Sequence, residues 1–86
     1  PPSTYLAVYR IKRKTSTGLE AVVQKVQSKL LSKGLRVDIL GPMPSFQGFG
    51  KVEWQIISKA KKRSSLIEVG ELLGSGWTVD LDALST

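Results

Sequence analysis

Four segments of the chain carry apolar side chains at about every second position. They span residues 4–12, 35–40, 51–59 and 77–82. A repeat of two is typical of a β-strand, because successive side chains of a strand point to opposite faces of the sheet. The pattern therefore predicts four short strands, of which the third fits best in the middle of a sheet.

A helix is predicted between the first two strands. Its apolar residues form one stripe at helical spacing, which consists of Leu19, Val22, Val23, Val26 and Leu30. Thr17 and Glu20 have the spacing of a capping box, in which each side chain hydrogen-bonds a free backbone amide at the helix start. Gly34 suits a left-handed stop after the helix. We therefore expect a helix from about Thr17 to about Lys33.

A second, shorter helix is predicted before the last strand. Ser65 and Glu68 repeat the capping-box spacing at its start, and Gly74 and Gly76 follow its end. Its apolar positions are Leu66, Val69, Leu72 and Leu73. The helix therefore has one face that must lie on the sheet.

The order of these six elements is β-α-β-β-α-β, which is the split βαβ plan. In that plan two helices cover one face of a four-stranded antiparallel sheet, and the fold class is α+β, similar to a small-subunit ribosomal protein fold. Eighty-six residues correspond to about one small domain with a modest core. We therefore expect residues 1–86 to form a single domain.

The stretch from residue 41 to residue 55, "GPMPSFQGFGKVEWQ", is predicted to be a loop that leads into the third strand. It matches neither a Walker motif nor a dinucleotide-binding motif, both of which lead into a helix. Pro42 and Pro44 are expected to fix the exit from the second strand. Phe46 and Phe49 either cap one end of the core or stack on single-stranded nucleic acid, with Tyr9 as a further candidate stacking residue. The structural alternative is the simpler one.

Composition excludes several kinds of chemistry. The chain has no cysteine and no histidine, which removes disulfides, thiolate nucleophiles, zinc fingers and imidazole catalysis. Asp80 and Asp82 are expected on one face of the last strand, but the sequence indicates neither a third ligand nor a basic partner for them, so they are a poor metal or catalytic pair. We expect no catalytic residue, no metal site and no cofactor.

The hydropathy pattern predicts neither a membrane span nor a signal peptide. No apolar run approaches the roughly 20 residues that cross a bilayer. Near the start of the chain the basic cluster follows the apolar stretch, which is the reverse of the order in a signal peptide. We expect a cytoplasmic protein with no membrane partner.

Basic residues are concentrated in the first three quarters of the chain. Residues 1–63 hold all 13 lysines and arginines against three acids, whereas residues 64–86 hold four acids and no base. The bases form three groups: Arg10, Lys12, Arg13 and Lys14; Lys25, Lys29 and Lys33; and Lys59, Lys61, Lys62 and Arg63. Each group alone is as consistent with a solvated surface as with a binding site. Together they favour contacts with nucleic-acid phosphates or with an acidic peptide.

Four segments in the right order resemble one protein family. They are "PPSTYLAVYRI", "VDILGPMPS", "WQIISKAKKRSSL" and "WTVDLDAL". The chain resembles the C-terminal domain of the bacterial primosomal replication-restart helicase, PriA (primosomal protein N′). The matching positions are Gly41, Pro42 and Pro44 in the turn, Trp54, Gln55 and Lys59 in the third strand, Arg63 and Leu66 at the helix start, and Asp80 and Asp82 in the tail. The chain departs from the family at Ala83, where proline is usual, and in "SFQGFG".

The resemblance implies a domain without helicase activity of its own, excised from a larger ATP-dependent helicase. In that family the domain helps the helicase core to hold branched DNA, and the acidic tail of the single-stranded-DNA-binding protein docks partly against it. We therefore expect forked or single-stranded DNA as a partner, contacted by Arg10, Lys12, Arg13, Lys14, Lys59, Lys61, Lys62 and Arg63. The alternatives are a domain that binds only an acidic peptide tail and a ribosomal-type RNA-binding domain. An acylphosphatase-like enzyme on the same plan is improbable, because no convincing arginine loop and asparagine pair is present.

Overall fold

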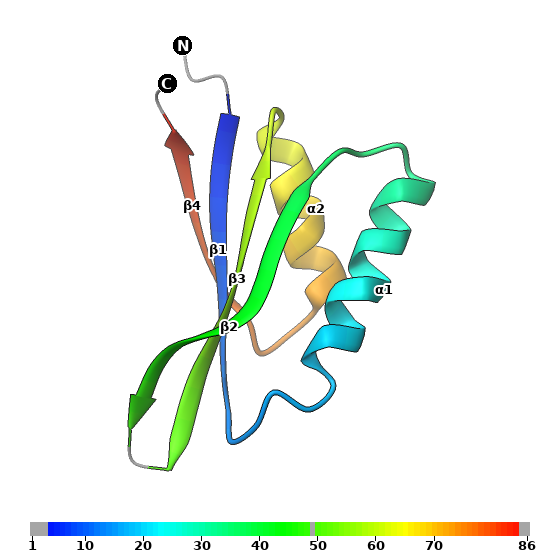
Figure 1. Ribbon diagram of the computed structural model, residues 1–86. Coiled ribbons are helices and arrows are strands. Elements are labelled where there is room, and N and C mark those ends of the chain that lie inside the picture. The colour runs from blue at the N-terminus through cyan, green and yellow to red at the C-terminus, as the bar shows by residue number, and fades with distance from the viewer. Residues whose placement is uncertain (1–3, 49, 85–86) are drawn as a thin grey trace.

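The computed structural model describes residues 4–48 and 50–84. The elements, in chain order, are β1 (Thr4–Arg13), α1 (Leu19–Ser32), β2 (Asp38–Gly48), β3 (Lys51–Ala60), α2 (Arg63–Leu73) and β4 (Thr78–Leu84). The strands form one antiparallel sheet in the order β2-β3-β1-β4. Both helices lie on one face of this sheet (Figure 1). The predicted α+β plan is confirmed, and β3 is a central strand as expected.

The core lies between the sheet and the helices, and Tyr9 is at its centre. Its side chain is fully buried, and its hydroxyl donates a hydrogen bond of 2.6 Å to the carbonyl oxygen of Leu66. The hydroxyl of Ser58 in turn donates to the Tyr9 oxygen over 3.2 Å. This chain of bonds joins β1, β3 and α2. The expectation that Tyr9 offers a stacking face was wrong, because its position in the alternation of β1 points it at the helices.

The start of α1 differs from the predicted capping box. The residue before the helix is Gly18, with a left-handed φ of 82°, and no side chain caps the helix start. The amide and the hydroxyl of Thr17 both lie within hydrogen-bond distance of the Thr15 hydroxyl. The pairing of Thr17 with Glu20 was therefore wrong, because the chain turns into the helix through the glycine.

The end of α1 is as predicted. Gly34 has a φ of 72°, and its amide donates to the carbonyl of Leu31 over 3.0 Å. The amide of Leu35 donates to the carbonyl of Leu30 over 2.9 Å. These two bonds form a Schellman motif, which satisfies carbonyl groups at the helix end.

The second capping box was also wrong. α2 begins at Arg63, its N-cap is Lys62, and no side chain caps it. Ser65 lies inside the first turn and is buried. The N-cap therefore lies three residues earlier than the capping pattern predicted.

The predicted loop at residues 41–48 is part of a strand. β2 begins at Asp38, three residues later than expected, and continues through Pro42 and Pro44 to Gly48. Its register with β3 shifts on either side of the segment from Met43 to Pro44. Proline lacks an amide donor, and an edge strand with bulges tolerates this loss. β2 and β3 form an arm that extends past the start of α1 (Figure 1).

Candidate nucleic-acid interface

The eight basic residues predicted to contact DNA fall at two ends of the sheet. In the register of β1 and β3, Lys12 is opposite Glu53, whereas Lys59 is opposite Leu6. Six residues of β1 separate these positions, which corresponds to about 20 Å at a rise of about 3.3 Å per residue. The first and third basic groups therefore do not form one patch.

The first group lies at the end of β1, and its members differ in their surroundings. Nε of Arg10 is 3.9 Å from a carboxylate oxygen of Glu53, and one of its terminal nitrogens is 3.8 Å from Asp80. Both acids lie on neighbouring strands of the sheet face that the helices leave open. Lys12, Arg13 and Lys14 are exposed. Arg10 is thus the member whose charge is most compensated within the protein.

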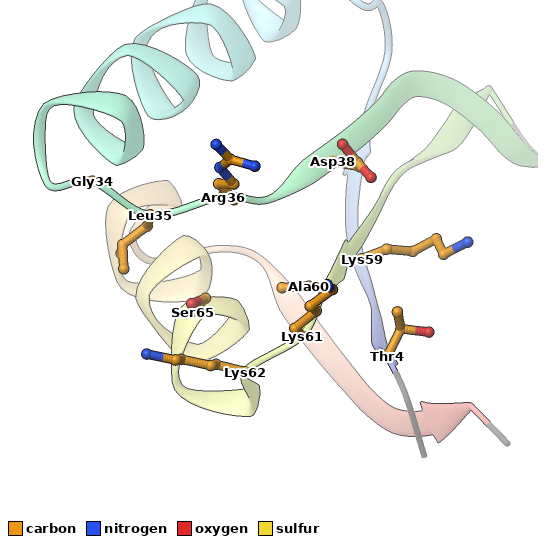
Figure 2. A pocket seen from close by; sticks show the side chains of 10 residues that line it. All are labelled: Thr4, Gly34, Leu35, Arg36, Asp38, Lys59, Ala60, Lys61, Lys62 and Ser65. Carbon is orange, nitrogen blue, oxygen red and sulfur yellow. The ribbon is translucent and has the colours of Figure 1, made fainter. Parts of the chain in front are cut away.

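Three members of the third group, Lys59, Lys61 and Lys62, line a pocket at the start of α2. The pocket has a volume of about 550 Å³ and is lined by four cationic side chains, Arg36, Lys59, Lys61 and Lys62. Among the described lining residues, Asp38 is the only acid. Figure 2 shows these residues arriving from three directions: the connection between α1 and β2, the end of β3, and the start of α2. Arg63 is the first residue of α2 and is exposed.

Sequence reasoning missed Arg36. In the sequence it lies between the second basic group and Lys51, outside every run of bases. Its neighbours in the sequence therefore did not indicate a binding residue. The turn at Gly34 directs the chain from the end of α1 back across the sheet, and this path brings Arg36 to the pocket. Arg36 therefore joins the pocket only through the tertiary fold.

The electrostatics of this pocket favour an anion. None of its four cations forms an ion pair with another described residue, because the ion pairs of the described chain involve only Arg10 and Lys33. α2 has no acidic residue in its first turn and no side-chain cap. Free amides at a helix start carry partial positive charge and attract anions.

The second group of bases lies on α1, apart from this pocket. Nζ of Lys33 is 2.8 Å from a carboxylate oxygen of Glu68, so this lysine links the two helices. Lys25 and Lys29 border a groove of about 240 Å³ between α1 and α2. The apolar side chains of the groove are those of Val22, Val26, Leu72 and Leu73. The helix lysines thus border an apolar groove.

The predicted stacking residues are not tested by the structure. Phe49 lies outside the described residues. The backbone of Phe46 pairs with Glu53 in the arm. On the open face of the sheet, the described side chains of β1 and β3 that alternate with the buried positions are aliphatic, hydroxyl, charged or amide, and none is aromatic. That part of the surface offers no stacking platform of the kind that single-stranded RNA uses.

Two further observations concern the residues that the structure describes. Within residues 4–48 and 50–84, neither helix is long and apolar enough to cross a membrane. In the same ranges no three acidic side chains gather closely enough to hold a metal ion.

Comparisons with known proteins identify the fold alone. No family model and no curated protein sequence matches the chain. Among solved structures it is similar to a de novo designed protein, Foldit4, with a TM-score of 0.60 and 10% sequence identity. The match covers 96% of this chain and 98% of the designed one. At this identity the likeness supports the β-α-β-β-α-β architecture and says nothing about a ligand.

Proposed function

We propose that this chain is a non-catalytic DNA-binding and protein-docking domain of a replication-restart DNA helicase, which acts in the cytoplasm on forked or single-stranded DNA. The observation that supports DNA binding best is the pocket at the start of α2, where Arg36, Lys59, Lys61 and Lys62 are free of ion pairs with the described residues. The family resemblance supplies the helicase context, in which the domain packs beside the helicase core.

Phosphate contacts account for this arrangement physically. Cations that are not neutralised within the protein raise the local concentration of a polyanion, and each contact releases counterions from DNA. The exposed cluster Lys12, Arg13 and Lys14 adds a second contact region at the other end of the sheet. Base-specific recognition is not required for such binding.

A salt series with matched variants tests the proposal. Fluorescence anisotropy of labelled forked, duplex and single-stranded DNA gives the slope of log affinity against log salt, which counts phosphate contacts. For single-stranded DNA, the variant Lys61→Glu/Lys62→Glu should lower the size of this slope by at least about 1.4, because each lost contact accounts for roughly 0.7. The control is Lys25→Glu/Lys29→Glu, which changes the net charge equally at the helix groove. Equal loss in both variants, with folding intact by circular dichroism, would show a general charge effect and contradict the assignment.

The groove between the helices favours a second function, docking of an acidic protein tail. Its apolar side chains and its two lysines, Lys25 and Lys29, complement a peptide that carries both carboxylates and apolar side chains. We propose the tail of the single-stranded-DNA-binding protein as the occupant. Affinity for a synthetic tail peptide should fall in Lys25→Glu/Lys29→Glu and persist in Lys61→Glu/Lys62→Glu. The reverse result would place the peptide at the start of α2.

A further inference from the structure

The pocket at the start of α2 contains a hydroxyl that has no hydrogen-bond partner among the described residues and belongs to an almost fully buried residue. Ser65 is 4% exposed and lines the pocket, and its side chain forms no hydrogen bond with any described residue. No fully enclosed polar side-chain atom of the described chain lacks a partner, so the Ser65 oxygen keeps contact with the pocket space. Figure 2 shows Ser65 on the first turn of α2, below Leu35.

Backbone donors accompany this hydroxyl. The amide of Ser65 donates to the carbonyl of Lys62 over 3.1 Å, whereas the amides of Arg63 and Ser64 have no partner among the described residues. Free amides at a helix start point outward along the axis, where they can bind an anion. The pocket thus combines hydroxyl and amide donors with Arg36, Lys61 and Lys62, whereas Lys59 projects toward the open face of the sheet, away from Ser65 (Figure 2).

We propose that this pocket binds the terminal phosphate group of a nucleic-acid strand. The inference rests on the proposed DNA-binding function and assigns the ligand group of its central site. A terminal phosphate carries about 1.5 to 2 negative charges near pH 7 and three acceptor oxygens. A phosphodiester within a strand, or a peptide carboxylate, has one charge and two such oxygens. The donor set, with three cations beside the hydroxyl and the amides and one acid among the described lining residues, matches the terminal phosphate best.

The test compares short single strands of one sequence with a 5′-phosphate, a 3′-phosphate or no terminal phosphate. Each unlabelled strand competes with the same labelled strand for the protein. A phosphate at one of the two ends should raise affinity about three- to tenfold, because charge-assisted bonds at a helix start are added. Ser65→Ala should reduce this gain and leave affinity for the unphosphorylated strand within about twofold. Arg36→Gln should reduce the gain as well, and because Arg36 also belongs to the proposed DNA-binding site, it should lower the affinity for the unphosphorylated strand too. Because Arg36 is exposed, its variant remains informative if Ser65→Ala unfolds.

Three outcomes overturn the inference, and they differ from failure of the proposed function. Equal affinity for the three strands contradicts the terminal-phosphate site while leaving DNA binding intact. A Ser65-dependent response to inorganic phosphate without any gain from a strand end indicates a free-phosphate site. Affinity for a tail peptide that falls in Ser65→Ala, without any gain from a strand end, assigns the pocket to a carboxylate. If the unphosphorylated strand does not bind at all, the proposed DNA-binding function itself fails.

Discussion

Gly41 occupies a backbone conformation that other residues rarely adopt. Its φ is 117°, and a Cβ atom at this position would lie 2.8 Å from the carbonyl oxygen of Gln55 in β3. We expect Gly41→Ala to lower the free energy of unfolding by about 2–3 kcal/mol, because both the backbone and the strand pairing must shift. Urea unfolding followed by circular dichroism measures the loss.

Gly70 is the matched control for this substitution. It lies within α2, and an added Cβ would be 3.5 Å from Cγ2 of Val79 and 3.7 Å from Cε1 of Tyr9, which are ordinary contacts. Gly70→Ala should therefore leave stability unchanged or raise it by up to about 1 kcal/mol, since alanine favours a helix interior. A loss as large as that of Gly41→Ala would contradict the packing between α2 and β4.

The hydroxyl of Tyr9 provides a pH-dependent prediction. Burial raises the pKa of Tyr9 above its usual 10.0, and the hydrogen bond from Ser58 opposes this only in part. The folded protein then holds the proton more tightly than the unfolded chain, so this stabilisation is complete below about pH 10 and is lost as the pH rises toward the folded pKa.

Tyr9→Phe should cost about 1–3 kcal/mol at neutral pH, because Ser58 and the carbonyl of Leu66 lose a buried partner. The stability difference between wild type and variant should shrink above pH 10. Unfolding titrations of both proteins between pH 7 and 11 measure it. A difference that stays constant or grows with pH would contradict the assigned shift.

At the scale of elements, the number of strands and their order along the chain followed from periodicity, whereas the helix starts did not. Both capping boxes had the right spacing, but a cap contributes only about 1 kcal/mol, and tertiary packing decides most helix starts. Leu19 and Leu66 are fully buried near the two starts, and their burial outweighs the lost cap. Similarly, Pro42 and Pro44 indicated a loop because proline disfavours central strands, but β2 is an edge strand.

The candidate site was predictable only in part, for the same reason. Lys59, Lys61 and Lys62 are close in sequence, so their shared surface follows from local spacing. Arg36 and the buried hydroxyl of Ser65 join them only through the turn after α1 and the position of α2 on the sheet. Long-range geometry of this kind leaves no trace in a single sequence.

The arm formed by β2 and β3 should open more readily than the centre of the sheet. β2 is an edge strand with two prolines and two register shifts, whereas β1 is paired on both sides. We expect amide protons of residues 43–48 to exchange at least about tenfold faster than those of residues 6–11, because local opening there breaks fewer contacts. Hydrogen exchange followed by NMR measures this. Equal protection would indicate that the arm unfolds only with the whole domain.

At the scale of the molecule, the open face of the sheet connects the two basic regions. Arg10 and Glu53 both lie on this face. Lys12 is an even number of residues from Arg10 along β1, and Lys59 is an even number from Glu53 along β3, so each lysine shares the face of its strand neighbour. The register between β1 and β3 is continuous. Both lysines therefore project to the same side, about 20 Å apart. A single DNA strand or duplex that follows the face can contact both regions at once.

This geometry predicts how substitutions at the two ends combine. If one DNA molecule spans the face, then the salt slope lost in Lys12→Glu/Lys14→Glu and the slope lost in Lys61→Glu/Lys62→Glu should add in the combined variant. Binding should remain one DNA per protein, which sedimentation can establish. If the two ends bind separate molecules, the wild type binds two DNAs, and each double variant keeps one site with an unchanged slope. One DNA that spans the face releases counterions at both ends in a single binding event, so the slopes lost at the two ends add. Additivity of the slopes therefore distinguishes one spanning DNA from two separate DNAs, even where the affinities are similar.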